Sequence, residues 1–92
     1  MTVRLTESAR WQLRAAAEAI AQQESVDRQR AFRTFVEALL ERVEIAVGEM
    51  TPLPDFSDLP QNEVVRQGYR FFFRNIGDSV WLVGVWNAHE SA

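Results

Sequence analysis

The sequence predicts one α+β domain over residues 1–92, built from an N-terminal β-strand, an antiparallel helical hairpin and a three-stranded antiparallel β-meander. Apolar residues alternate at the start of the chain, recur at three- and four-residue steps in the middle, and give way to aromatic, strand-forming segments after residue 62. With 92 residues and 47% hydrophobic content, the chain is long enough for one core and too short for two.

The first predicted element is a short strand over residues 1–5, in which Val3 and Leu5 share one side. Thr6 then offers a hydroxyl N-cap for a helix that runs to about Gln23. The apolar stripe of this helix is made mainly of small side chains, so the helix can approach its neighbours closely. The stripe consists of Ala9, Leu13, Ala16, Ala17 and Ile20.

A second helix follows a short polar connector, and either Ser25 or Asp27 can cap it. Gly48 stands where a left-handed C-cap belongs. A short polar connector between two amphipathic helices of similar length leaves few arrangements other than an antiparallel hairpin that bury both apolar stripes. The second stripe consists of Phe32, Phe35, Val36, Leu39, Leu40, Val43, Ala46 and Val47.

Residues 50–61 contain three prolines together with Asp55, Ser57 and Asp58, which predicts an ordered connector without a regular element. The carboxylates of Asp55, Asp58 and Glu63 match no calcium-loop spacing, and turn chemistry accounts for them. The chain has no cysteine and a single histidine, so we expect no metal site and no cofactor.

Three strands are predicted beyond the connector, over residues 63–66, 69–75 and 79–86, with turns at Gly68 and at Gly77-Asp78. A two-residue loop at the second turn sets a register from which the two faces of the sheet can be written out. The face expected to receive the helical hairpin collects Tyr69, Phe71, Phe73, Val80, Leu82, Gly84 and Trp86. The opposite face collects Arg70, Phe72, Arg74, Trp81, Val83 and Val85.

This opposite face is too apolar for a surface in contact with water. A solvated sheet face normally alternates to polar residues. Here a contiguous apolar patch framed by Arg70 and Arg74 is expected, made of Phe72, Trp81, Val83 and Val85. Tryptophan and arginine are enriched at binding hot spots, so the patch predicts a protein partner. The alternative is that the proline-containing connector or the C-terminal tail folds over the face, with Arg74 stacking on Trp81.

Charge and hydropathy limit the partner classes. The net charge is −3 and all ten basic residues are arginine, so the overall field does not draw the chain onto nucleic acid, although a local basic patch is compatible with it. Arg4, Glu7 and Arg10 break any signal-peptide pattern, and the longest apolar run, 80–86, is too short to span a bilayer. We therefore expect a cytoplasmic protein with no membrane partner.

Three motifs resemble the RelE/ParE family of bacterial toxins. Residues 2–9 (TVRLTESA) resemble the opening strand and helix start of that family, residues 68–74 (GYRFFFR) its glycine–tyrosine–arginine–aromatic strand, and residues 77–86 (GDSVWLVGVW) the strand that closes its fold. The resemblance covers nearly the whole chain. It implies the same order of elements, namely a strand, two helices, a connector and an antiparallel meander.

The resemblance implies one of two activities. RelE-like members cleave messenger RNA on the ribosome, and ParE-like members poison DNA gyrase. RNA cleavage needs a base, an acid and cations for the phosphorane, which RelE-like members supply with lysine, arginine and a tyrosine or histidine near the C-terminus. Here Arg70 matches the strand arginine of the family, but there is no lysine, no tyrosine follows Tyr69, and Asn87 stands where related chains place histidine.

These departures and the long helical hairpin favour the ParE-like branch. We therefore expect the toxin of a type II toxin–antitoxin system, which binds DNA gyrase and is neutralised in a hetero-oligomer with a cognate antitoxin whose disordered segment folds on it. The expected antitoxin contacts are Arg70, Phe72, Arg74, Trp81 and Val83, with the two arginines pairing with antitoxin carboxylates. For Arg70 the alternative is a structural ion pair with a helix carboxylate.

Two other functions stay open. The first is an mRNA endoribonuclease acting with the ribosome, in which Arg70 and Arg74 hold phosphate and His89 shuttles protons. A lone histidine near the end of a chain is more often a solvated tail residue. The second is an inactive toxin relic that serves as a binding module.

Overall fold

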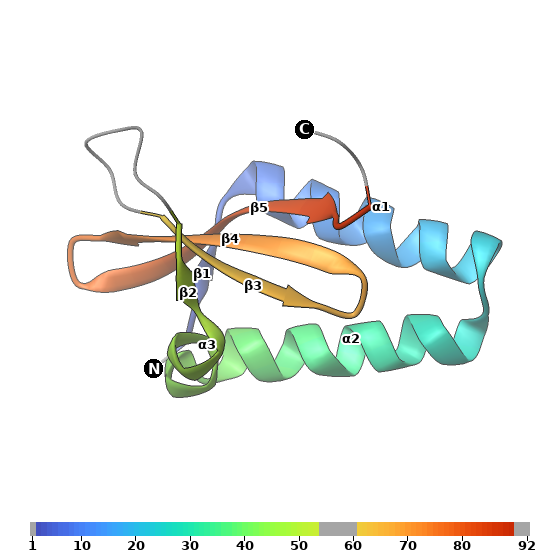
Figure 1. Ribbon diagram of the computed structural model, residues 1–92, viewed down its shortest axis with the longest axis horizontal. Coiled ribbons are helices and arrows are strands. Elements are labelled where there is room, and N and C mark those ends of the chain that lie inside the picture. The colour runs from blue at the N-terminus through green and yellow to red at the C-terminus, as the bar shows by residue number, and fades with distance from the viewer. Residues whose placement is uncertain (1, 54–60, 90–92) are drawn as a thin grey trace.

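Three helices and one five-stranded mixed sheet make up the described part of the chain, residues 2–53 and 61–89 of the computed structural model (Figure 1). This confirms the α+β class. In chain order the elements are β1 (Arg4–Leu5), α1 (Glu7–Gln23), α2 (Val26–Glu41), α3 (Val43–Glu49), β2 (Thr51–Pro52), β3 (Asn62–Arg66), β4 (Tyr69–Ile76) and β5 (Ser79–Asn87).

The sheet has the strand order β1-β5-β4-β3-β2. Strands β3, β4 and β5 pair antiparallel in sequence order, and β2 adds to β3 in the same sense. Strand β1 pairs in parallel with β5, so the sheet is mixed. The two short flanking strands thus widen the predicted three-stranded antiparallel unit on both sides.

The first two helices begin at predicted caps and form a hairpin. Thr6 Oγ1 accepts a hydrogen bond of 3.1 Å from the backbone N–H of Ala9, and Ser25 caps α2 in the same way. The two helices run in opposite directions (Figure 1). Across them, the Gln29 side chain donates to the Ala17 carbonyl at 3.0 Å. The prediction of an antiparallel pair is confirmed.

A break at Arg42 divides the second predicted helix into α2 and α3. Arg42 has extended dihedral angles (φ −133°, ψ 108°), and Figure 1 shows α3 nearly end-on beside α2. The prediction of one continuous helix with Gly48 as its left-handed cap is therefore wrong, because Gly48 lies inside α3. Val47, predicted to lie on the buried stripe, is 55% exposed because the break redirects the chain.

The connector contains a short strand that was not predicted. Thr51 pairs with Glu63, and the backbone N–H of Leu53 donates to the Gln61 carbonyl at 3.0 Å. The prediction of no regular element over 50–61 is wrong for Thr51–Pro52, which form an edge strand, where proline is tolerated. The other connector residues on which the prediction was based lie outside the described residues; they are Pro54, Asp55, Ser57, Asp58 and Pro60.

The core lies between the helices and one face of the sheet. Phe71 is fully buried, and its ring lies 6.1 Å from that of Phe32 and 5.9 Å from that of Phe35, both on α2. Burial of one such side chain contributes about 1.5–3 kcal/mol. The other buried apolar residues are Val3, Ala9, Ala16, Ala17, Ile20, Val36, Leu39, Ala46, Val64, Phe73, Leu82 and Val85.

The first strand joins the helical layer to the sheet. Arg4 lies beside Trp81 in the parallel β1–β5 pair, and the backbone N–H of Val3 donates to the Leu40 carbonyl at 2.8 Å. Val3 is buried and Arg4 exposed, as the predicted alternation requires. This pairing brings a residue from the start of the chain to the outer surface of the sheet.

Candidate functional site

A β-bulge in β5 decides which side chains form the outer surface of the sheet. The β4–β5 hairpin turns at Gly77-Asp78 as predicted, and its register holds from there to Leu82. The next residue, Val83, has no register partner on β4. One extra residue reverses the alternation of every side chain that follows it.

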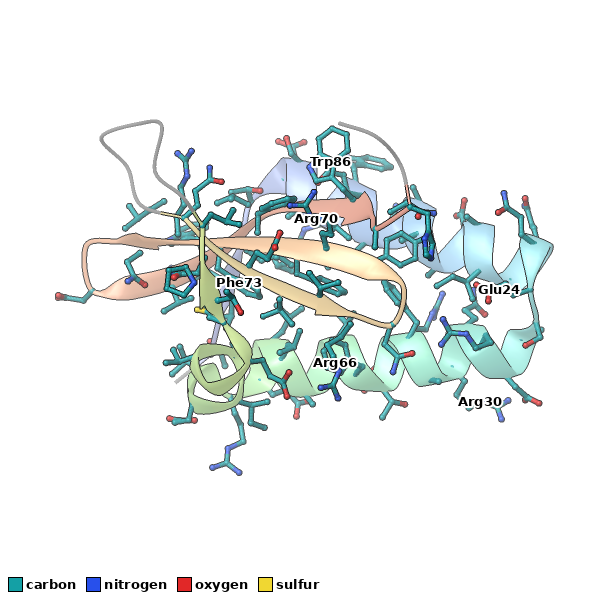
Figure 2. The ribbon with its side chains drawn as sticks, viewed as in Figure 1. Glu24, Arg30, Arg66, Arg70, Phe73 and Trp86 are labelled. Atoms are coloured by element: carbon teal, nitrogen blue, oxygen red, sulfur yellow. The ribbon has the colours of Figure 1, made fainter. Side chains whose placement is uncertain are left out.

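The bulge exchanges the predicted positions of Val85 and Trp86. Val85 pairs with Phe71 and is 5% exposed, so it belongs to the core face. Trp86 pairs with Arg70 and is 54% exposed. Figure 2 shows Arg70 and Trp86 on the side of the sheet away from α2, and Phe73 on the α2 side. The predicted faces are therefore wrong beyond the bulge, which also moves Gly84 to the outer surface.

We call this outer surface the open face. Residues that pair in register across strands share a face, so the open face can be read as three rows. The rows are Val65, Arg70 and Trp86; Glu63, Phe72 and Gly84; and Arg74, Trp81 and Arg4. Four of the five predicted antitoxin contacts, Arg70, Phe72, Arg74 and Trp81, therefore lie together, while the fifth, Val83, is the half-buried residue of the bulge.

Arg70 is held by a carboxylate of the neighbouring strand. Glu63 Oε2 accepts from Arg70 Nε at 2.9 Å and from Nη2 at 2.7 Å, and the Arg70 guanidinium lies 5.1 Å from the centre of the Phe72 ring. The Arg70 side chain is 34% exposed and that of Glu63 16%. The expected alternative of an ion pair is thus present, but its carboxylate comes from β3, not from a helix.

The other two arginines of the open face have different partners. The Gln61 carboxamide faces Arg74, and with its oxygen turned toward the guanidinium it accepts from Arg74 Nε at 3.0 Å. The guanidinium over Trp81 belongs to Arg4, at 5.9 Å from the ring centre. The cation expected there was Arg74. Arg4 was missed because its neighbour in the sheet lies near the other end of the sequence.

The charge of the open face differs in sign from that of the chain. Its described residues include three arginines (Arg4, Arg70 and Arg74) and one carboxylate (Glu63), whereas the whole chain carries −3. The aromatic residues Phe72 and Trp81 lie half-buried among these charges. Such a combination of aromatic surface and guanidinium groups is suited to an acidic partner with apolar side chains.

Gln12 of α1 holds β5 just beyond the bulge. Its Oε1 accepts a hydrogen bond of 2.8 Å from the backbone N–H of Val85. A Cβ placed on the preceding residue, Gly84, would make ordinary van der Waals contacts, at 3.4 Å from Trp86 Nε1 and 3.5 Å from Phe72 Cδ2. The Trp86 and Phe72 side chains therefore both lie close to Gly84. Gln12 carries no sequence signal for this role beyond its polar character on a helix.

His89 lies in a different place from the arginines with which the nuclease alternative groups it. It lines a cleft of about 230 Å³, together with Asn87 and the Arg28–Gln67 pair, in which Arg28 Nη1 donates to Gln67 Oε1 at 2.6 Å. The His89 backbone N–H donates to Asn87 Oδ1 at 2.8 Å. The cleft lining includes neither of the two arginines, which lie on the open face.

Residues 2–53 and 61–89 contain no cluster of histidine and carboxylate side chains that could hold a metal ion. Within the same ranges, every helix falls short of the length and apolar character that crossing a membrane requires.

Comparison with known proteins adds no relative. No protein-family model matches the chain, and no curated protein sequence matches it.

Proposed function

We propose that the chain is the toxin of a type II toxin–antitoxin pair, of the ParE-like branch of the RelE/ParE family. In this proposal it inhibits growth by binding DNA gyrase, and a cognate antitoxin neutralises it by covering the open face. The order of elements supports the family: a strand, a helical hairpin, a connector and an antiparallel β3–β4–β5 unit.

The open face carries the proposal. It places the aromatic side chains of Phe72, Trp81 and Trp86 beside three arginines, on a chain that is acidic as a whole. An antitoxin segment that is disordered alone gains both apolar burial and charge-assisted hydrogen bonds by folding there. After Glu63 has engaged Nε and Nη2 of Arg70, the Nη1 donors remain for a partner carboxylate.

The arrangement of charges weighs against the nuclease alternative. General acid–base catalysis requires the proton-transferring group and the phosphate-binding cations to meet at one substrate. His89 lines its own cleft with Asn87, whereas Arg70 is engaged by Glu63 on the open face. The chain therefore offers a surface for binding more readily than a centre for catalysis.

Induced expression in a bacterial host tests the proposal. We expect growth arrest that is relieved when the small reading frame next to the gene is co-expressed, and we expect the purified protein to inhibit gyrase supercoiling while transcripts on purified ribosomes stay intact. The nuclease replaces the proposal if transcripts are cleaved, if Arg70→Ala and His89→Ala each abolish that cleavage, and if supercoiling is unaffected. Absence of growth arrest leaves the inactive relic.

A further inference from the structure

Trp86 is the most exposed aromatic side chain of the open face. It is 54% exposed, in contrast to Phe72 and Trp81, which are half-buried. It reaches this face only because of the bulge at Val83, and it stays there because Gln12 bonds the backbone of the preceding residue. A large exposed apolar ring held by a defined backbone irregularity is a feature of a binding surface.

Arg4 is the arginine of the open face that has neither a carboxylate nor a carboxamide partner among the described residues. Arg70 forms an ion pair with Glu63, and Arg74 faces the Gln61 carboxamide. Within residues 2–53 and 61–89, Arg4 forms no ion pair, and its guanidinium lies 5.9 Å from the centre of the Trp81 ring. When a guanidinium stacks on an aromatic ring, the N–H groups along its edge are still available to donate hydrogen bonds to a carboxylate.

From these two positions we propose that Trp86 and Arg4 are the two anchors of the open face, and that they bind an acidic peptide segment of a partner protein. This rests on the proposed use of the open face. Trp86 packs against a large apolar side chain of the segment, and Arg4 pairs with a carboxylate. Arg4 lies beside Trp81. The β4 partners of Trp81 and Trp86 are four residues apart, so the two anchors are about 14 Å apart along the strands.

A protein segment fits this face better than single-stranded nucleic acid. Stacking platforms for bases need free aromatic ring faces. The rings of Phe72 and Trp81 already carry guanidinium groups at 5.1 and 5.9 Å, and the chain as a whole is acidic. Guanidinium edges offered beside a tryptophan match carboxylates next to an apolar residue.

The structure contains a matched control for both anchors. Trp11 on α1 is 60% exposed, and the guanidinium of Arg14 lies 5.0 Å from its ring centre. Trp11 and Arg14 match the residue types of the two anchors, but they contact each other and belong to a helix, not to the open face. Comparing substitutions at the two anchors with substitutions at Trp11 and Arg14 therefore distinguishes binding at a specific site from nonspecific binding by exposed tryptophan and arginine.

The test selects binders of the full chain from a random peptide-display library. We expect the selected peptides to be acidic and to contain a large apolar residue. Trp86→Ala and Arg4→Glu should each weaken binding of synthetic selected peptides at least tenfold, while Trp11→Ala and Arg14→Glu should change it less than twofold. Thermal unfolding and circular dichroism of each variant confirm that it is folded, as expected for exposed positions.

Several results overturn the inference. It fails if no peptide is selected, if the selected peptides lack acidic residues, or if the α1 substitutions weaken binding as much as those on the open face. It also fails if a twelve-nucleotide oligouridine binds more tightly than the peptides and loses affinity in Trp86→Ala. The growth-arrest experiment is independent of this test. Arrest without peptide binding contradicts only the assignment of Trp86 and Arg4 as anchors. Peptide binding without arrest contradicts only the proposed toxin function.

Discussion

Gln12 on α1 accepts a hydrogen bond of 2.8 Å from the backbone N–H of Val85 on β5. Gln12→Ala leaves this partly buried donor without its acceptor, so we expect the free energy of unfolding to fall by about 1–2 kcal/mol. Amide hydrogen exchange at Val85 should accelerate in parallel. Gln22→Ala, at an exposed position of the same helix, is the control and should change stability by less than about 0.5 kcal/mol. An unchanged exchange rate at Val85 would contradict the role given to Gln12.

Deleting Val83 should remove the bulge without exchanging the faces of β5. Val85 and Trp86 keep their register partners, Phe71 and Arg70. Val85 therefore stays in the core and Trp86 on the open face. We expect the free energy of unfolding in chemical denaturation to fall by about 1–2 kcal/mol, and Val83→Ala, which keeps the residue count, should lose about 1 kcal/mol. A loss of more than about 4 kcal/mol on deletion would show that the register beyond the bulge is not kept.

The ion pair between Arg70 and Glu63 should contribute measurably, because both side chains are mostly shielded from water. Glu63→Gln is expected to lower the free energy of unfolding by about 1.5–3 kcal/mol, the range for hydrogen bonds to charged groups. The comparison is Asp27→Asn, which removes the partner of Arg30 in an exposed pair with a separation of 3.8 Å. That change should fall within about 0–1 kcal/mol. Similar losses at both pairs would mean that the burial of the first has no energetic effect.

Two glycines should respond in opposite directions to alanine. Gly68 has φ +79°, a left-handed conformation that alanine adopts only under strain, so Gly68→Ala should destabilise the protein by about 1 kcal/mol or more. Gly48 lies within α3 with open space around a Cβ, so Gly48→Ala should stabilise it by about 0.5–1 kcal/mol. Thermal unfolding measures both. A destabilising Gly48→Ala would favour the left-handed cap expected from sequence.

Local signals in the sequence were sufficient to place the starts of the first two helices and the β4–β5 turn. Thr6 and Ser25 begin their helices because a hydroxyl can accept a hydrogen bond from a nearby backbone N–H, whatever the rest of the fold. The turn at Gly77-Asp78 is specified equally locally. The break at Arg42 has no such signal, because the apolar stripe continues on both sides of it without proline or glycine.

The details of the candidate site depend on contacts that the pattern does not contain. Val83, Val85 and Trp86 are all apolar, so the hydrophobic pattern fits a straight strand and a bulged strand equally well. The position of Arg4 beside Trp81 depends on a parallel pairing between distant parts of the chain. Neither anchor of the open face can therefore be identified from the residues next to it in the sequence.

The pairing of β1 with β5 also determines when, during synthesis of the chain, the open face can form. The backbone N–H of Thr6 donates to the Leu82 carbonyl at 3.2 Å, although the two residues are 76 apart in the chain. At a synthesis rate of about 5–20 residues per second, Thr6 waits about 4–15 s for its partner to be made. A nascent chain without β5 lacks Trp81 and Trp86 and leaves Arg4 unplaced. Recognition of the open face is therefore restricted to chains whose translation has passed β5.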